Sequence, residues 1–294
     1  MTILVSTVFQ KLIVMLSDST ITTTHFTDDQ GNYFNEYESG SKYYRFPGVG
    51  CITTWGDHTY NRLGAFLQKQ RISPSTHSVN DLADLTYKYI VEEYRKDEHD
   101  ELGFHIGGFG RDNRPHLYHA FWGFDRPKPK HQLSPKPDKY DHSDWVFLYN
   151  GHNDLADTVI GAFKKQLESG QETRFNIKTF IGRICLCDFI ARFAAEVTPE
   201  VGPPFVMHLV FADNSIEKIE NNSFSPISLQ AIAPVLPRLL QDKSNTPPPS
   251  SPPNRPPPNP SDYCVPTGTG ASTLLSDNPT YYGGTANQNW QERD

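Results

Sequence analysis

Thr2 stands directly behind the initiator methionine, at a position from which a threonine can act as a nucleophile. An N-terminal threonine carries its own base, because its hydroxyl and its α-amino group belong to one residue. This chemistry requires that Met1 be removed, as a methionine before a small second residue normally is. It also requires a carboxylate and a lysine nearby, and backbone N–H groups placed to stabilise an oxyanion.

Asp18 is the candidate carboxylate. Two apolar, β-like runs cover residues 3–9 and 12–16, separated by a polar pair. Runs of this kind around a short polar break predict a β-hairpin. The end of its second strand would return beside its first residue, which places Asp18 next to Thr2. An ordinary strand start followed by a turn explains the same pattern without catalysis, and spacing alone leaves both interpretations open.

Lys42 and Gly56 are the candidates for the lysine and for the oxyanion N–H donor. Lys42 opens the strand predicted over residues 41–46, and Gly56 falls where a strand predicted over 49–55 gives way to a helix. Free backbone N–H groups are usual at such a junction. Lys11 is the alternative lysine, although its place favours a turn, and Lys42 could equally be a solvated lysine at a strand edge.

The remaining pattern predicts further strands and helices around these residues. Strands are predicted over 20–26, 102–109, 116–124, 145–149 and 205–211, helices from about 57 and 78, near 155–170 and over 175–197, and exposed loops at 28–32 and 126–141. The order is therefore strands, two helices, strands, two helices and a strand. This order favours two packed sheets with helices on both outer faces over a doubly wound parallel sheet.

Composition narrows the classes of function. The chain carries 34 acidic and 27 basic side chains, and its formal charge of -7 argues against a general nucleic-acid-binding protein. No apolar stretch approaches the roughly 20 residues that span a bilayer. The first residues lack the basic region and the cleavage pattern of a signal peptide. The four cysteines have no metal-ligand spacing, as expected in a reducing compartment, so a cytoplasmic location is predicted.

The character of the sequence changes near residue 240. Residues 246–260 form a proline tract, which favours polyproline II and has no apolar face to bury. The sequence after it is rich in Gly, Ser, Thr and Asn and is predicted to be disordered. We therefore expect a folded domain over 1–240 and a Pro-rich tail over 241–294. The tail could bind SH3- or WW-like domains, or it could serve as a spacer.

The order of these motifs resembles the proteasome β-subunit family of N-terminal nucleophile hydrolases. T-I-L-V-S-T-V-F and V-M-L-S-D-S-T-I-T match the family's nucleophile strand and the strand that ends in its Asp-Ser element. K-Y-Y-R-F-P-G-V-G-C-I-T-T-W-G-D resembles its lysine strand and its glycine-bearing strand, and G-F-H-I-G-G-F-G…R-P-H-L-Y its central hairpin. The likeness runs from about residue 2 to 211 and is closest to the bacterial members, including the ancestral β-subunit type.

The resemblance implies a group of catalytic residues: the nucleophile Thr2, then Asp18, Lys42, the oxyanion donor Gly56, and Asn150. Asn150 falls where the family has the serine of a Gly-Ser-Gly element, and residues 199–204 keep neither the aspartate nor the serine of a later element. The resemblance further implies an α+β, four-layer αββα sandwich, a ring or spiral homo-oligomer, and threonine-type cleavage of peptide bonds in peptides or unfolded proteins. An ATP-dependent unfoldase is a possible partner, and no nucleic acid or membrane is implied.

Two alternatives to a peptidase stay open. One is a catalytically inactive scaffold or sensor on the same fold, acting through oligomerisation and the tail, and the other is a non-peptide amidohydrolase, since fold does not fix the substrate. No metal or organic cofactor is implied. His116 and His119 invite a metal interpretation, but residues three apart on a strand lie on opposite faces and no Cys or acidic cluster joins them. Polar histidines of a strand are the favoured interpretation.

Overall fold

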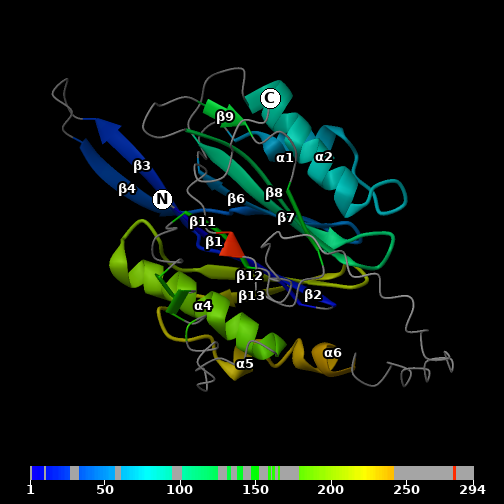
Figure 1. Ribbon diagram of the computed structural model, residues 1–294. Coiled ribbons are helices and arrows are strands. Elements are labelled where there is room, and N and C mark those ends of the chain that lie inside the picture. Colours follow the sequence, from blue (N-terminus) through cyan, green and yellow to red (C-terminus); the bar gives the residue numbers. More distant parts are fainter. Residues whose placement is uncertain are drawn as a thin grey trace, which may run out of the picture.

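Two β-sheets pack face to face, and helices cover both outer faces of the pair (Figure 1). The structure is a computed structural model. It describes residues 2–9, 11–26, 33–56, 61–94, 101–124, 131–133, 138–141, 147–151, 158–159, 161–162, 165, 179–241 and 281–282. The predicted fold class, α+β with a four-layer αββα architecture, is confirmed.

The first sheet has the strand order β13-β12-β2-β1-β11-β14. Its strands are β1 (Ile3–Phe9), β2 (Leu12–Ser17), β11 (Phe147–Gly151), β12 (Phe205–Phe211), β13 (Ile216–Asn221) and β14 (Tyr281–Tyr282). β1 and β2 pair antiparallel from Leu4↔Ser17 to Phe9↔Leu12, as the predicted hairpin requires. Their residues are buried on both faces because α4 covers one face of β1 and β2 and the second sheet covers the other, which explains two nearly continuous apolar runs.

The second sheet has the order β10-β8-β7-β6-β5, with β9 beside β8. Its strands are β5 (Tyr43–Phe46), β6 (Gly50–Gly56), β7 (Leu102–Phe109), β8 (Pro115–Phe124), β9 (His131–Leu133) and β10 (Asp138–Asp141). The loop predicted over 126–141 is therefore wrong at β9 and β10. These strands are too short and too polar to show an alternating pattern, and they form by pairing with the edge of β8.

A separate hairpin of β3 (Thr20–Phe26) and β4 (Tyr33–Ser39) follows β2 directly and projects from the body of the molecule (Figure 1). Its seven cross-strand pairs run from Thr20↔Ser39 to Phe26↔Tyr33. The sequence did not predict β4, because a two-stranded ribbon with exposed faces needs no apolar alternation. The loop predicted at 28–32 lies outside the described residues.

The helices divide between the two outer faces. α1 (Leu63–Lys69), α2 (Val79–Tyr89) and the π-helical turn η1 (Ile90–Tyr94) cover the second sheet, while α4 (Phe180–Val197), α5 (Leu229–Ile232) and α6 (Leu236–Gln241) cover the first (Figure 1). Ser78 starts α2 with a capping box, in which its side chain and that of Asp81 accept hydrogen bonds from each other's backbone N–H. α1 begins at Leu63, later than the predicted start near 57.

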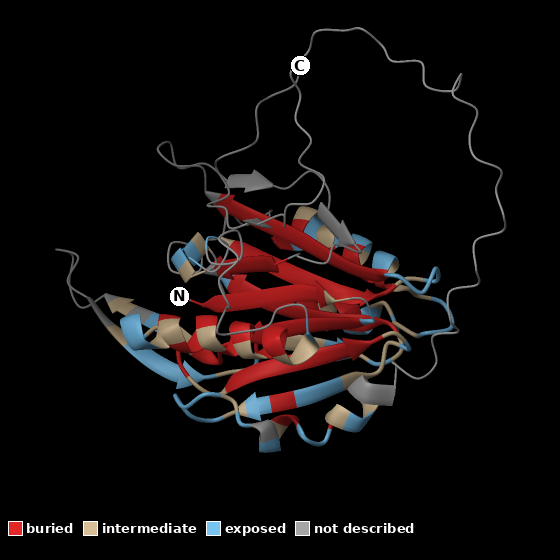
Figure 2. Cartoon of the chain, turned by 60° about the horizontal axis from the view of Figure 1, so that its bottom comes forward, coloured by how far each residue is buried: buried red, intermediate tan, exposed pale blue. Residues whose placement is uncertain are grey.

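Buried residues gather in the strands of both sheets and on the helix faces turned toward them (Figure 2). Apolar clusters lie between the first sheet and α4, and between the second sheet and α1 and α2. Two more lie between the sheets, one of them formed by Leu4, Trp55 and Phe121. The layer between the sheets is therefore closed at its centre, and β1 turns one face toward this layer and the other toward α4.

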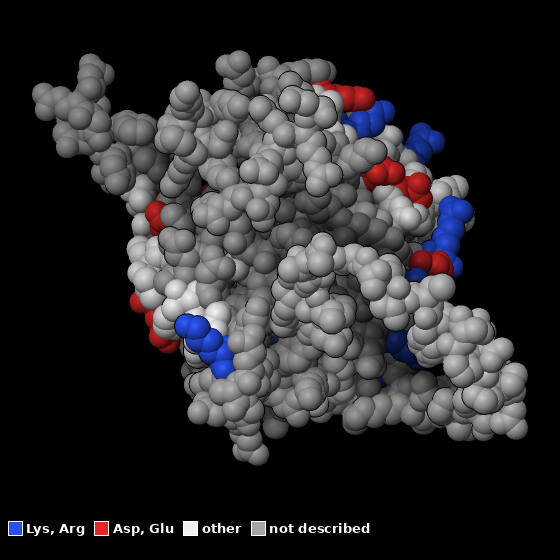
Figure 3. Space-filling view, viewed as in Figure 1, with Lys and Arg blue, Asp and Glu red and all other residues white. Residues whose placement is uncertain are grey.

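Only two parts of the predicted tail are among the described residues. Gln241 ends α6, and β14 pairs in parallel with β11 through Phe147↔Tyr281 and Leu148↔Tyr282. The rest of 242–294 lies outside the described residues. None of the described helices has the length and apolar character needed to cross a membrane. On the face shown in Figure 3, the described Lys and Arg residues stand among Asp and Glu residues and form no patch of one sign.

Candidate active site

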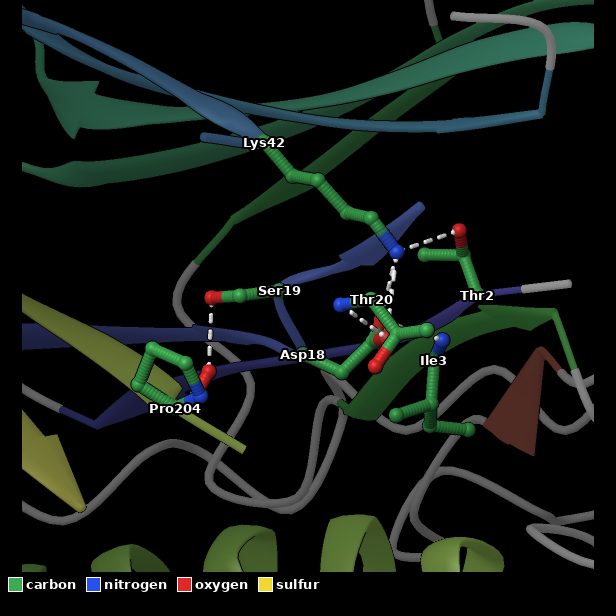
Figure 4. Close-up of polar contacts among 7 residues, drawn as sticks. All are labelled: Thr2, Ile3, Asp18, Ser19, Thr20, Lys42 and Pro204. Carbon is green, nitrogen blue, oxygen red and sulfur yellow. Dashed lines mark hydrogen bonds and ion pairs between the residues drawn. The ribbon is translucent and has the colours of Figure 1, made fainter. Parts of the chain in front are cut away.

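Thr2, Asp18 and Lys42 meet at the open end of the β1–β2 hairpin (Figure 4). Lys42 Nζ donates a hydrogen bond to Thr2 Oγ1 over 2.8 Å. It also donates to Asp18 Oδ1 at 3.0 Å and to Asp18 Oδ2 at 3.1 Å. All three side chains are buried, with exposed fractions of 5% for Thr2, 0% for Asp18 and 1% for Lys42. The structure therefore brings the candidate nucleophile, carboxylate and lysine into one cluster.

The hairpin geometry fixes the place of Asp18. Its backbone N–H donates to the carbonyl of Ile3 at 3.2 Å, which extends the pairing of β2 with β1 by one residue. Its side chain then accepts two backbone N–H bonds, from Ile3 at 3.0 Å and from Thr20 at 3.1 Å. The carboxylate is thus held by the first residue of β1 and the first residue of β3. It cannot turn away from Thr2 without losing both bonds.

Lys42 reaches the site from the other sheet. It lies just before β5, and its carbonyl accepts the backbone N–H of Thr54 on β6 at 2.9 Å. The N–H of Gly40 donates to the carbonyl of Ser19 at 2.7 Å, which ties the approach to Lys42 to the end of β2. The long side chain then extends toward Asp18 and Thr2 (Figure 4). It is a buried link between the two sheets, so the interpretation as a solvated edge lysine is wrong.

The hydrogen bonds match an ionised pair. An ammonium has three N–H donors, and Lys42 uses three, one to Thr2 and two to Asp18. A carboxylate offers about four acceptor sites, and four donor bonds reach Asp18. Burial lowers the pKa of Lys42, and the charge of Asp18 opposes this shift. Burial likewise raises the pKa of Asp18, against the opposing effect of Lys42 and of the backbone N–H of Ile3.

The segment before β12 closes one side of the cluster. Ser19 donates its backbone N–H to the carbonyl of Gly202 at 3.3 Å and its hydroxyl to the carbonyl of Pro204 at 2.6 Å (Figure 4). A Cβ at Gly202 would stand 2.7 Å from Thr20 Oγ1, so the backbone packs closely there. Residues 199–204 therefore support the end of β2 through their carbonyls, although they lack the aspartate and serine of the resembling family.

Gly56 lies at the end of β6 that faces the start of β1. Leu4 packs against Trp55, the residue before Gly56, in the inter-sheet cluster. Gly56 has φ +88, and a Cβ there would stand 2.1 Å from the carbonyl oxygen of Glu101. Both features require glycine. Its backbone N–H makes no hydrogen bond to Thr2 or Lys42 among the described residues.

Asn150 lies beside Thr2 on the same sheet. It is the partner of Leu4 in the antiparallel β1–β11 register, so Thr2 is its diagonal neighbour on the same face. Asn150 Oδ1 bonds to His105 Nε2 over 2.6 Å, and its exposed fraction is 5%. Asn150 therefore joins a second hydrogen-bond system next to the cluster rather than the Thr2–Lys42–Asp18 cluster itself.

His105 and Ser6 are polar residues of this region that the sequence analysis missed. His105 Nδ1 and Ser6 Oγ are 2.9 Å apart, and both side chains are fully buried between the sheets. The available signal was positional. Thr2 and Ser6 share one face of β1 because side chains alternate along a strand. On β7, His105 stands between Gly103 and Gly107 on the inward face, the one large polar side chain in that row.

His116 and His119 point to opposite faces of β8, as their spacing predicts. His119 stacks on Phe121 with ring centroids 4.7 Å apart and meets His105 edge-on at 5.5 Å. His116 stacks on Tyr118 and pairs with Asp112 at 3.1 Å. Within the part of the chain that the structure describes, no three His, Cys, Asp or Glu side chains are grouped as ligands for a metal ion.

Comparisons of sequence leave the chain without a match, since no model of a protein family fits it and no curated protein matches it. Comparison of structures finds similar folds. Anbu, the ancestral β-subunit, from Yersinia bercovieri matches with a TM-score of 0.52 and 11% identity, covering 84% of this chain and 98% of that one. The Gly-1 mutant of Anbu from Hyphomicrobium sp. strain MC1 matches with a TM-score of 0.50 and 12% identity, covering 84% and 99%.

A third similar structure is the helical assembly of the Anbu complex from Pseudomonas aeruginosa. Its chain matches with a TM-score of 0.50 and 16% identity, covering 84% of this chain and 98% of that one. The alignment therefore covers nearly the whole of each similar structure. Sequence identities this low support a shared fold but do not indicate a shared reaction. The chain therefore shares its fold with these Anbu structures, in agreement with the proteasome-like αββα fold that the sequence predicts.

Proposed function

We propose that this chain is a threonine-type peptidase that uses Thr2 as its N-terminal nucleophile after removal of Met1. The observation that supports this most strongly is the hydrogen bond of 2.8 Å from Lys42 Nζ to Thr2 Oγ1, within a buried ion pair with Asp18. A buried ammonium aimed at a hydroxyl lowers the proton affinity of that hydroxyl, because the positive charge stabilises the alkoxide.

In the proposed reaction, the α-amino group of Thr2 takes the hydroxyl proton as Oγ1 attacks the carbonyl carbon of a peptide bond. The Oγ1–C bond forms, and the carbonyl electron pair moves to oxygen. Lys42 favours the neutral form of the α-amine through like-charge repulsion and stabilises the developing charge on Oγ1. Because all three donors of Lys42 are occupied, the α-amine is the better base of the two. Asp18 orients Lys42.

The oxyanion is assigned to the backbone N–H of Gly56, with the side chain of Asn150 as a further polar group beside Thr2. Collapse of the tetrahedral intermediate breaks the C–N bond, and the leaving amine takes the proton held by the α-ammonium. The product is an ester between Thr2 Oγ1 and the acyl group. A water molecule then gives a proton to the α-amine as its oxygen attacks the ester carbon. The C–Oγ1 bond breaks, the α-ammonium returns the proton to Oγ1, and a carboxylic acid and the free hydroxyl of Thr2 are released.

The same proposal covers the setting of the reaction. Residues 1–240 form the hydrolase domain, with 241–294 as the tail, and the substrates are peptides or unfolded proteins. A ring or spiral of identical chains in the cytoplasm is proposed, supported by the helical assembly described for Anbu of Pseudomonas aeruginosa. An ATP-dependent unfoldase would supply unfolded chains to such an assembly.

Intact mass spectrometry tests the proposal. The purified chain is expected to lack Met1 and to gain the mass of one molecule of an electrophile that traps N-terminal threonines, with the adduct on Thr2. Thr2→Ala should abolish the adduct, whereas Thr23→Ala, an exposed threonine on β3, should leave it unchanged. Retained Met1, or an adduct that survives in Thr2→Ala, would contradict the peptidase assignment.

A further inference from the structure

Ser6, His105 and Asn150 form a hydrogen-bonded chain that crosses between the two sheets. Ser6 Oγ lies 2.9 Å from His105 Nδ1, and His105 Nε2 lies 2.6 Å from Asn150 Oδ1. Ser6 is on β1, Asn150 on β11 and His105 on β7. Ser6 and His105 have exposed fractions of 0% and Asn150 one of 5%. These three side chains lead from the fully buried centre of the inter-sheet layer outward to the candidate active site.

Asn150, the outer end of this hydrogen-bonded series, lies next to Thr2. Leu4 is the β1 partner of Asn150, and its side chain packs on Trp55 and Phe121 of the second sheet. Thr2, Leu4 and Ser6 alternate onto that same face of β1. Asn150 is therefore a diagonal neighbour of both Thr2 and Ser6 on one sheet face, at the roughly 7–8 Å that separates such pairs. His105 occupies the space between Ser6 and Asn150 from the opposite sheet.

The protonation of His105 follows from its partners. Burial lowers the pKa of His105 to about 4, so the ring is neutral at pH 7 and has one donor and one acceptor. Asn150 Oδ1 only accepts, so Nε2 carries the hydrogen and donates to it. Nδ1 then accepts the hydroxyl hydrogen of Ser6. The ring of His119 meets His105 edge-on, and burial lowers the pKa of His119 well below its usual value, so it adds no charge at pH 7.

We propose that His105 is a positioning residue for the reaction at Thr2: it holds the side-chain oxygen of Asn150, so that the Asn150 NH2 group is left as a donor toward the Thr2 end of the site. A free carboxamide can rotate and present either its oxygen or its nitrogen. Because Ser6 Oγ can donate to Nδ1, the Nε2-protonated ring has a partner on each nitrogen, and its Nε2–H holds the carboxamide oxygen. This inference rests on the proposed peptidase function, since it assigns a purpose to the orientation of Asn150.

Three substitutions of His105 separate the two bonds of the chain. His105→Gln places an amide N–H near the position of Nε2 and keeps the donor to Asn150. His105→Asn places its amide near the position of Nδ1 and keeps only the partner of Ser6. His105→Phe keeps the ring and removes both bonds. The matched control is His208→Phe, because His208 is also fully buried on a central strand and neither of its ring nitrogens has a hydrogen-bond partner.

The first measurement is the rate constant for trapping of Thr2 by the electrophile in the full-length chain, with melting temperatures recorded for each variant. We expect His105→Gln to stay within about threefold of wild type, and His105→Asn and His105→Phe to react about tenfold more slowly, the effect of one lost hydrogen bond. Adding Asn150→Ala to each variant should remove these differences, because His105 acts through Asn150. A merely structural role would order the rates by melting temperature instead.

The second measurement is independent of activity. A proton–nitrogen correlation spectrum of the histidine rings should show the Nε2-protonated, Nδ1-unprotonated form for His105. The opposite tautomer, or equal trapping rates in wild type and in all three His105 variants, overturns the inference and leaves the proposed function intact. A wild-type chain whose Thr2 is not trapped overturns the proposed function, and with it the reaction that the positioning would serve.

Discussion

Replacing Lys42 by methionine tests whether the buried ion pair belongs to the reaction and not only to the fold. In Lys42→Met, the carboxylate of Asp18 keeps its two backbone N–H bonds but loses the one cation that pairs with it among the described residues. Breaking a buried pair by removing one partner costs about 3–5 kcal/mol, because the remaining charge is left uncompensated. For a domain of this size that corresponds to a fall in melting temperature of roughly 6–20 °C.

The double variant Lys42→Met/Asp18→Asn separates charge from packing. It leaves no charge at positions 18 and 42, and one carboxamide oxygen still accepts a backbone N–H bond. We expect its cost in unfolding free energy to be smaller than the sum of the two single costs by at least about 2 kcal/mol. Urea denaturation at pH 7 measures all four corners of the cycle. Lys11→Met is the matched control, since Lys11 is exposed in the β1–β2 turn and its removal should change stability by no more than about 0.5 kcal/mol.

Trapping of Thr2 in the same variants gives the catalytic half of the test. The double variant restores much of the stability but has no ammonium beside Thr2 Oγ1, so the adduct should form at least a hundredfold more slowly than in wild type. Trapping in the double variant at the wild-type rate would refute the role given to Lys42. Additive stability costs would refute the charge pairing on which that role depends.

Three further outcomes are expected. Burial lowers the pKa of His208 from 6.5 to about 3, so the unfolded chain binds more protons between these values and stability falls as the pH falls, by up to about 1.4 kcal/mol per pH unit. His208→Phe should reduce the slope in urea titrations from pH 7 to 5 by this contribution, while those of His105 and His119 remain, and an unchanged slope would contradict it. Gly56→Ala should lower the melting temperature sharply because of its φ of +88 and a Cβ contact of 2.1 Å, while Gly123→Ala, with no contact under 3.6 Å, should not. Asn214→Ala removes two hydrogen bonds of 2.6 and 2.8 Å to the backbone of β7, and it should lower the free energy of unfolding by about 2–3 kcal/mol in urea denaturation. Asn113→Ala, at an exposed asparagine that also has a positive φ, should lower it less.

The hairpin that places Asp18 beside Thr2 could be predicted from the sequence. Two apolar runs around a polar pair set the strands and the turn, and the distance from Thr2 to Asp18 then follows from an antiparallel register of that length. The start of α2 at Ser78 was equally local, because a capping box needs only residues three apart. Both features form between residues that are close in the chain, so they can be predicted from the sequence.

Which lysine reaches Thr2, by contrast, does not depend on residues close to it in the chain. Lys11 and Lys42 each stand just before a strand, so their places in the sequence are alike. Only the packing of the second sheet on the first buries Lys42 against Thr2 and leaves Lys11 exposed. The short strands β9 and β10 also depend on tertiary structure. They form because they pair with the edge of β8, and their own sequences show no alternation that would predict them. Tertiary context decides where intrinsic preference is weak.

By itself, therefore, the sequence determined the alternation of strands and helices, the hairpin, and the chemistry available at Thr2. The tertiary structure decided which distant groups meet there: a lysine from the second sheet, and a histidine on β7 that holds Asn150 of the first. The physical reason is that strand pairing and capping arise between residues close in the chain or joined by a short turn. The contacts of Lys42 and His105 arise instead from the stacking of two sheets, whose relative placement is set by the whole core.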